Sequence, residues 1–351
     1  MTSAPFNQRR AYSNVRVYNV ESPQARLLLA DNTSAFGMPP SAVAAIRDVA
    51  YDTLASYPST YSGELREALA AYVGVAPDEV VVTAGSDEAM SCAFRALAEP
   101  DQLVAHIAPT FVMTPVFAVT NSLRTVAVPL TTTFDADADA LLNVGADVLY
   151  LCSPNNPTGN CLTSGSMARV LGEHPGLVIL DEAYAEFSGT TLAREAPGHG
   201  RLLVLRTLSK AFGLAGMRVG YAVGARPLIA ELEKARGPFA VTALSEQAAL
   251  AAVRHDTAWV QRAVAVVRQS RDRFMQGLLA AGFRPLPSDA NFVLVPVRSA
   301  TAAAGSLLDR GILVRGFVGL PGIGDALRIT VGSESVMQEV LHVMQGLTLC
   351  E

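Results

Sequence analysis

The stretch LLVLRTLSKAFGLAGMRVGY, residues 202–221, decides the fold that we expect for this chain. Its first part is an apolar run that does not alternate with polar residues, which is typical of a strand buried on both faces of a sheet. The run ends at Ser209 and Lys210, in a segment rich in serine, glycine and alanine. The pattern therefore predicts a buried strand with a lysine at its carboxyl end, where open α/β sheets bind ligands.

Similar apolar runs lie on the N-terminal side of this stretch and are separated by helical segments. They are EVVVTAG (79–85), LRTVAVPL (123–130), DVLYLCSP (147–154) and GLVILDEAY (176–184). Buried strands that alternate with helices predict an α/β fold with a mostly parallel sheet flanked by helices.

The C-terminal part of the chain changes character. Residues 245–281 have a long amphipathic helical pattern, which predicts a connecting helix. Three strand patterns follow: ANFVLVPV (290–297), GILVRGF (311–317) and ALRITVG (326–332). We expect three parts, which are an N-terminal arm that joins a small domain (residues 1–40), a large domain (41–240), and a connecting helix with a small α+β domain (241–351).

The composition excludes several functional classes. With a formal net charge of −5 and a pI near 5.6, the 351-residue chain has no general attraction to nucleic acid or to an anionic membrane. Residues 103–123 lack charged side chains, but their prolines and polar residues favour a strand, a turn and a buried helix over a membrane span. No apolar stretch of signal-peptide length follows the N-terminal residues, so a cytoplasmic location is expected.

Two further patterns are given structural interpretations. The cysteines and histidines show no paired spacing of the kind that metal ligands have, so no metal site is predicted. The acidic stretch DADADA (135–140) is interpreted as a solvated loop.

Four short motifs follow the predicted strands in a fixed order. They are AGSDEA (84–89), SPNNPTG (153–159), DEAY (181–184) and TLSKAFGLAGMRVGY (207–221). Their order and spacing resemble fold-type I enzymes that depend on pyridoxal 5′-phosphate (PLP), and most closely the histidinol-phosphate aminotransferase group. The resemblance extends from about Asp31 to Gly332 and implies that the large domain binds PLP.

The resemblance implies roles for residues that would contact the reactive parts of PLP. Lys210 would hold the cofactor as a Schiff base and carry protons, because desolvation can lower the pKa of a buried lysine; the alternative is a surface lysine. Asp181 would keep a proton on the pyridine nitrogen, and the alternative is a turn or cap residue. Asn156 and Tyr184 fall where the family contacts the phenolic oxygen of the ring.

The phosphate of PLP would be bound at a helix N-terminus. The backbone amides of Ser86 and Asp87, the Ser209 hydroxyl and the Arg218 guanidinium match the family's phosphate ligands. A simple helix cap is the alternative for Ser86 and Asp87.

Two aromatic residues are assigned by the same resemblance. Phe111 would stack on the pyridine ring, although a core phenylalanine is the alternative. Tyr57 resembles the tyrosine that reaches the cofactor phosphate of the neighbouring subunit, which implies a homodimer with shared active sites.

The substrate-binding residues are expected to include two arginines. Arg315 and Arg328 lie thirteen positions apart, as in histidinol-phosphate aminotransferases, where the pair binds the substrate phosphate. Arg328 would also bind an α-carboxylate, and a rim charge is the alternative for either residue. The chain departs from the family at Asp31-Asn32-Thr33-Ser34, where relatives usually read Asn-Glu-Asn-Pro. Asn32 is a candidate substrate ligand there, and Tyr12 or Tyr18 would replace the tyrosine that covers the substrate.

The resemblance therefore implies a transaminase of histidine biosynthesis that uses histidinol phosphate and 2-oxoglutarate. An aromatic or other amino-acid aminotransferase, or a decarboxylase of the threonine-phosphate type, remains open, because PLP supports all of these reactions. A PLP-binding transcription factor is disfavoured, since the sequence ahead of Asp31 leaves no room for a helix-turn-helix and there is no basic patch.

Overall fold

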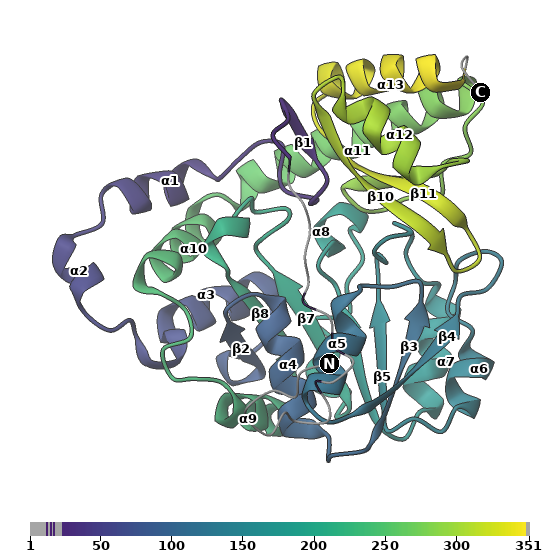
Figure 1. Ribbon diagram of the computed structural model, residues 1–351. Helices are drawn as coiled ribbons and strands as arrows, with labels where there is room; N and C mark the ends of the chain where they lie inside the picture. The colour runs from purple at the N-terminus through teal and green to yellow at the C-terminus, as the bar shows by residue number, and fades with distance from the viewer. Residues whose placement is uncertain (1–11, 13–14, 16, 18–22, 349–351) are drawn as a thin grey trace, which may run out of the picture.

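The computed structural model describes residues 12, 15, 17 and 23–348, and these residues contain two β-sheets (Figure 1). The larger sheet has seven strands in the order β2-β8-β7-β6-β5-β3-β4, and only β8 runs antiparallel to its neighbours. Its strands are β2 Val80–Thr83, β3 Leu103–Ala108, β4 Arg124–Pro129, β5 Val148–Cys152, β6 Leu177–Asp181, β7 Leu202–Thr207 and β8 Gly220–Gly224.

Side chains of the large sheet enter two separate apolar cores, one on each face. In β5, for example, Leu149 and Leu151 belong to one core, whereas Val148 and Tyr150 belong to the other. Helices α3, α6, α7, α10 and α11 pack on the first core, and α4, α5 and α9 pack on the second. Apart from the partly exposed edge strand β4, the strands are therefore buried on both faces, and the predicted three-layer α/β fold is confirmed.

The smaller sheet has the order β1-β10-β11-β9. Its strands are β1 Leu27–Leu29, β9 Phe292–Pro296, β10 Ile312–Leu320 and β11 Gly324–Thr330. The N-terminal strand β1 pairs in parallel with β10, so residues close to the start of the described chain join a sheet formed by its C-terminal part. This arrangement places the small sheet above the carboxyl edge of the large one (Figure 1).

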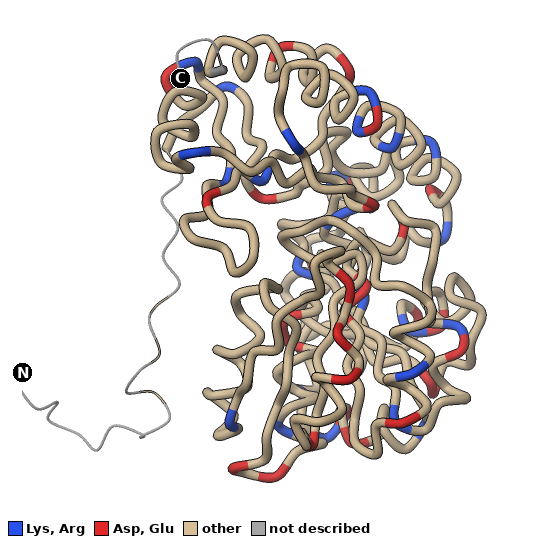
Figure 2. The backbone as a smooth tube through the Cα atoms, turned by 90° about the vertical axis from the view of Figure 1, so that its right-hand side faces the viewer, with Lys and Arg blue, Asp and Glu red and all other residues tan. Residues whose placement is uncertain are grey.

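The helices complete the layers around both sheets. Their bounds are α1 Pro40–Arg47, α2 Tyr51–Ala55, α3 Gly63–Val73, α4 Ser86–Leu97, α5 Met113–Thr120, α6 Ala138–Asn143, α7 Ser164–Glu173, α8 Ala185–Ser188, α9 Arg226–Ala235, α10 Ala243–His255, α11 Thr257–Ala280, α12 Ala300–Leu308 and α13 Glu334–Thr348. Among the described residues, no helix combines the length and apolar character needed to cross a bilayer. Basic and acidic residues are interspersed along the chain (Figure 2).

Two local predictions were wrong. The expected connecting helix is broken into α10 and α11 at Asp256, whose φ of −116° and ψ of 13° are not helical. The Asp256 carboxylate accepts a hydrogen bond from the distant Ser41 amide at 2.7 Å. The stretch DADADA is not a solvated loop. Asp137 caps α6 by accepting from the Ala140 amide, and Asp135 accepts from the Thr163 amide, each at 2.9 Å.

Candidate active site

The carboxyl ends of the parallel strands open onto a cavity of about 310 Å³ between the two sheets. Most of the predicted site residues line this cavity. They are Asn32, Ser86, Asp87, Phe111, Asn156, Asp181, Tyr184, Ser209, Lys210, Arg218, Arg315 and Arg328. The alternating βα pattern brings these residues together, because motifs that follow parallel strands end at the same edge of the sheet.

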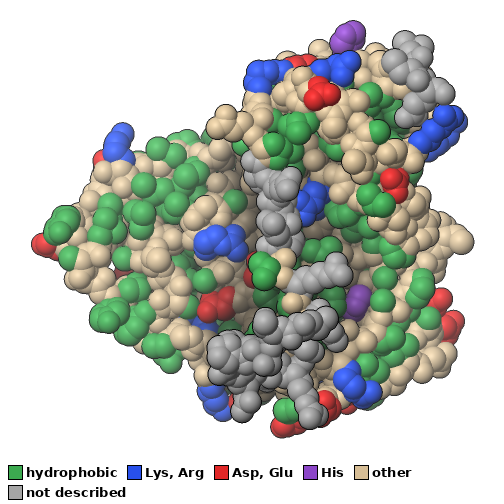
Figure 3. All heavy atoms as spheres, viewed as in Figure 1, with side chains coloured by type: hydrophobic (Ala, Val, Ile, Leu, Met, Phe, Trp, Pro, Cys, Tyr) green, Lys and Arg blue, Asp and Glu red, His purple; other side chains and the backbone are tan. Residues whose placement is uncertain are grey.

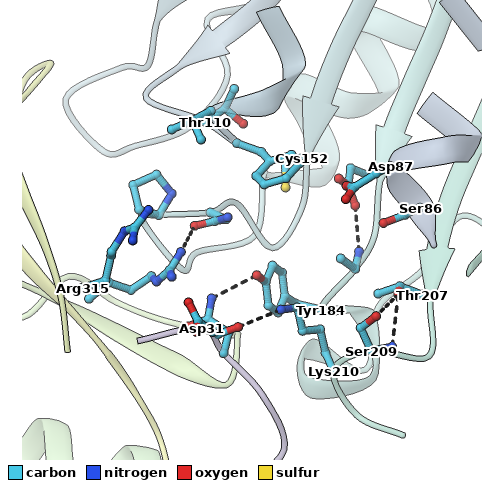
Figure 4. Close-up of a pocket in the computed structure, with 18 of the residues that line it drawn as sticks. Asp31, Ser86, Asp87, Thr110, Cys152, Tyr184, Thr207, Ser209, Lys210 and Arg315 are labelled. Atoms are coloured by element: carbon cyan, nitrogen blue, oxygen red, sulfur yellow. Dashed lines mark hydrogen bonds between the residues drawn. The ribbon is translucent and has the colours of Figure 1, made fainter. Parts of the chain in front are cut away.

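Lys210 follows β7 and points towards the segment at Asp31 (Figure 4). Its Nζ donates a hydrogen bond to the Asp31 carbonyl oxygen at 2.9 Å. Burial, assisted by the Arg328 guanidinium, lowers the pKa of Lys210 to about 8. The sequence contains one other lysine, Lys234, whose side chain is 70% exposed and forms an ion pair with Glu231. Lys210 thus has the environment of a reactive amine, whereas Lys234 fits the description of a surface lysine.

Asp181 lies at the end of β6 and is buried. Its Oδ1 accepts a hydrogen bond from the Ala183 amide at 3.0 Å, and its Oδ2 accepts one from the Tyr150 hydroxyl at 2.8 Å. Burial raises the pKa of Asp181 to about 6, although these two hydrogen bonds oppose the shift. The bond to Ala183 has the form of a turn-stabilising contact, so Asp181 both shapes its loop and lines the cavity.

Tyr184 is held by a side chain of the N-terminal segment. Asn32 donates through Nδ2 to the Tyr184 oxygen at 3.0 Å. Asn32 is itself fixed by Thr330 of β11, whose hydroxyl donates to Asn32 Oδ1, and by Asn291, which donates to its carbonyl oxygen. Burial raises the pKa of Tyr184 to about 12, so its phenol stays protonated near neutral pH.

The first turn of α4 forms one end of the cavity together with Arg218. Backbone amides in the first turn of a helix have no acceptor within the helix, so the Ser86 and Asp87 amides can bind an anion. The N-cap residue is Gly85, which has no side chain to cap the helix, whereas Glu88 accepts a hydrogen bond from the Ala84 amide ahead of the helix at 2.6 Å. Gly85 adopts a φ of +83°, and a Cβ there would lie 2.6 Å from Arg218 Nη2. Glycine therefore permits the close approach of the guanidinium to the helix start.

Neighbouring residues of the NNPTG motif have different surroundings. Asn155 is fully buried and bonds to Thr110, to Thr158 and to the carbonyl oxygen of Pro109. Asn156 faces the cavity instead, where its Oδ1 accepts a hydrogen bond from Arg328 Nη1 at 2.6 Å. The first asparagine shapes the loop, and the second is available to a ligand.

The two predicted substrate arginines are cross-strand neighbours. Arg315 of β10 pairs directly with Arg328 of β11, and both line the cavity. Arg328 also donates to the Ala30 carbonyl oxygen at 2.5 Å and lies over the rings of Phe292 and Phe317. Like charges at opposed positions repel each other, so this pair forms a positive wall suited to an anionic ligand.

Two other predicted tyrosines, Tyr57 and Tyr12, are not among the described residues that line the cavity. Tyr57 is 83% exposed and stacks on Phe239, with their ring centroids 4.9 Å apart. Tyr18 lies outside the described residues. The roles given to these tyrosines stay predictions.

Comparison with known families identifies the architecture. A family model described as aminotransferase class I and II matches residues 26–344. The chain belongs to this family. The expected family and fold-type I architecture are thereby confirmed.

Individual aminotransferases resemble the chain over most of its length. A histidinol-phosphate aminotransferase of Methylibium petroleiphilum is 40% identical over 301 residues, which are 83% of this chain and 81% of the relative. One from Roseiflexus castenholzii is 38% identical over 337 residues, covering 92% and 90%. Among solved structures, histidinol-phosphate aminotransferase from Sinorhizobium meliloti in complex with pyridoxal-5′-phosphate has a TM-score of 0.86 at 25% identity, covering 99% of this chain and 100% of that one.

Several residues that line the cavity were not predicted from the sequence. They are Asp31, Thr33, Thr110, Val112, Cys152, Pro157, Ala183, Thr207, Ala215, Phe317 and Leu320. Thr207 could have been found, since it lies in the TLSK motif and its hydroxyl accepts a hydrogen bond from the Ser209 amide at 3.1 Å. Asp31 contributes a backbone carbonyl, for which its side-chain identity gives no signal.

Proposed function

We propose that the chain is a PLP-dependent aminotransferase that moves the amino group of histidinol phosphate to 2-oxoglutarate, a step of histidine biosynthesis. The observation that carries the proposal is the opposed pair Arg315 and Arg328, which lines the same cavity as Lys210. An amine donor with a phosphate group supplies the anion that such a pair requires. The names of the relatives in Methylibium petroleiphilum and Roseiflexus castenholzii support the same substrate.

The residues of the cavity fit PLP. The close approach of Arg218 to Gly85 forms a cradle for a phosphate at the start of α4. Asp181 offers a buried carboxylate for the ring nitrogen, and Phe111 offers an aromatic face. Lys210, whose pKa is lowered to about 8, offers the amine that the aldehyde needs.

When bound, PLP draws electrons away from the substrate carbon that bears the amine. The chain itself supplies binding, orientation and proton transfer. Lys210 Nζ would bind the cofactor and, once displaced by the donor amine, move a proton as a general base and acid. Tyr184 and Asn156 would orient the ring through its phenolic oxygen. Arg328 would bind the carboxylate of 2-oxoglutarate in the second half-reaction.

The proposed active form is a homodimer. Tyr57 does not line the cavity of its own chain. It stacks on Phe239, and Val43, Tyr51 and Leu54 of α1 and α2 are also exposed apolar side chains. Hydrophobic side chains gather over α1 and α2 in Figure 3, as expected for a protein-binding surface. A second subunit that covers this surface would let Tyr57 reach the partner's cofactor phosphate. We also propose a cytoplasmic location, because no apolar stretch of signal-peptide length follows the N-terminal residues.

An absorbance titration of the PLP-loaded protein tests the proposal. Histidinol phosphate should convert the visible band of the lysine-bound cofactor to the pyridoxamine form, and 2-oxoglutarate should restore it. If an aromatic amino acid converts the band and histidinol phosphate does not, the proposed donor is wrong. If amino-acid donors release carbon dioxide and no donor, histidinol phosphate included, forms pyridoxamine phosphate, the proposed transamination is wrong.

A further inference from the structure

A tyrosine on the neighbouring strand contacts Asp181 from within the sheet. Tyr150 lies on β5, which pairs in parallel with β6 in a register that places Cys152 beside Asp181. Tyr150 precedes Cys152 by two residues, so its Cα lies roughly 6.6 Å along the strand direction from the position opposite Asp181. Its phenol spans this distance on the same face of the sheet and ends 2.8 Å from Asp181 Oδ2.

The direction of this hydrogen bond follows from the chemistry of its partners. An ionised carboxylate can only accept. Tyr150 is fully buried, and burial beside Asp181 raises its pKa well above the ordinary value, so the phenol keeps its proton. Tyr150 therefore donates, and together with the Ala183 amide it gives each Asp181 oxygen one fixed donor.

We propose that Tyr150 is a positioning residue, which fixes the Asp181 carboxylate and keeps it an anionic partner for a protonated cofactor ring. This inference rests on the proposed PLP function. A carboxylate stabilised by a donor has a lower affinity for protons. The proton between Asp181 and the ring nitrogen then stays on nitrogen, which is the form that withdraws electrons. Without the donor, the proton moves towards the Asp181 oxygen and the ring becomes a weaker electron sink.

The other titratable groups near Asp181 shift its pKa in opposite directions. Asp87 at the start of α4 raises its pKa, whereas Lys210 lowers it. Cys152 and Tyr184 also interact electrostatically with Asp181, but burial keeps both neutral near pH 7 by raising their pKa values. Among these neighbours, Tyr150 alone donates a side-chain hydrogen bond to Asp181 within the part of the chain that the structure describes.

The first test uses the cofactor-free protein and does not depend on activity. The Asp181 carboxyl is titrated by ¹³C NMR, with Asp181→Asn to assign its resonance. Tyr150→Phe should raise its pKa from about 6 by about one unit. The matched control is Tyr221→Phe, because Tyr221 is also fully buried and its hydroxyl has no hydrogen-bond partner among the described residues.

Replacing Tyr150 by 3-fluorotyrosine guards against a simple loss of folding. Its more acidic phenol is a stronger donor, so the Asp181 pKa should move down, opposite to Tyr150→Phe. General destabilisation would not produce shifts of opposite sign. If Tyr150→Phe and the fluorinated protein both titrate like wild type, the inference is wrong.

The second test loads the proteins with ¹⁵N-labelled PLP. In Tyr150→Phe the ring-nitrogen resonance should move towards the neutral pyridine value, whereas Tyr221→Phe should match wild type. If the wild type forms a visible band and Tyr150→Phe leaves the resonance unchanged, the inference fails while the proposed function stands. If wild type binds no PLP, the proposed function fails and this inference fails with it.

Discussion

The two walls of the cavity hold their functional side chains in different ways. On the large-sheet wall, Asp181 ends the parallel strand β6, Lys210 follows the parallel strand β7, and each belongs to a short local motif. On the small-sheet wall, Arg328 of β11 is fixed by Asn156 and by the carbonyl oxygen of Ala30, which is far away in sequence. Asn32 connects the two walls, since it bonds to Thr330 and donates to Tyr184.

This difference separates two kinds of specificity. The large-sheet wall carries the groups that we propose to act on PLP in any of its reactions, and its geometry follows from strand ends at one edge. The small-sheet wall carries charges that select an anion, and its geometry depends on contacts between distant segments. Changes in the first wall should therefore affect every substrate, whereas changes in the second should discriminate among substrates.

The largest expected effect is on the large-sheet wall. Lys210→Ala removes the amine that we propose to hold the cofactor and transfer protons, so turnover should fall by about 10³-fold or more with every donor. Steady-state assays with several amines measure this. Lys234→Ala is the matched control and should retain full turnover, because Lys234 is an exposed partner of Glu231. An active Lys210→Ala protein would contradict the assignment.

The next effect should distinguish the two arginines of the small-sheet wall. Arg328→Met should lower kcat/KM about 100-fold in both half-reactions, since charged hydrogen bonds are lost. Arg315→Met should lower it about tenfold or more for histidinol phosphate, but leave the 2-oxoglutarate half-reaction almost unchanged. Single-turnover spectra measure each half-reaction separately. Arg273→Met is the control, because Arg273 forms an exposed ion pair with Glu334. Equal losses of kcat/KM in both half-reactions for Arg315→Met would refute the separate roles of Arg315 and Arg328.

A smaller effect is expected from the repulsion between Arg328 on the small-sheet wall and Lys210 on the large-sheet wall, which lowers the pKa of Lys210. The pKa of Lys210 is lowered from its ordinary value of 10.5 to about 8, so the neutral amine predominates only above about pH 8. The rate of PLP attachment to cofactor-free protein should rise with pH and level off above about pH 8. Arg328→Met removes a nearby cation, so it should move this midpoint upward by about one unit. Stopped-flow absorbance measures the rate, and an unmoved midpoint would show that the two walls are electrostatically independent.

The smallest effect concerns the residue that connects the walls. Asn32 has a φ of +55°, which glycine tolerates, so Asn32→Gly removes the side chain without backbone strain. Loss of the bond to Tyr184 should lower kcat about fivefold, in line with roughly 1 kcal/mol for one hydrogen bond. Asn143→Gly, at the exposed end of α6, controls for the substitution itself. A wild-type kcat in a folded Asn32→Gly protein would show that the hydrogen bond from Asn32 to Tyr184 does not contribute to turnover.

The same difference between the walls explains how far the sequence could predict the molecule. Lys210 and Asp181 were predictable because strand patterns and motif spacing are local, and parallel strands bring their ends together. The contact of Tyr150 with Asp181 was not, since nothing local reveals which strand lies beside β6 or in which register. Likewise, the contact of Asp256 at the helix break is with the Ser41 amide, 215 positions away.

Adjacent residues of one motif show a limit at shorter range. Asn155 and Asn156 have the same side chain. The family resemblance pointed to Asn156, which lines the cavity, but nothing in the motif shows that Asn155 is buried by hydrogen bonds to Thr110, Thr158 and the Pro109 carbonyl oxygen. Tyr57 shows a different limit, because its expected function needs a second subunit. Its exposure is compatible with that expectation, but only an assembly can display the contact.

The most direct test of the central claim is to locate the bound cofactor chemically. The PLP-loaded protein is reduced with borohydride, digested, and mapped by mass spectrometry, with Lys234→Arg protein alongside. The account predicts one phosphopyridoxyl group on Lys210 in both proteins. Label on Lys234, or no label on either lysine of a PLP-saturated protein, would contradict it.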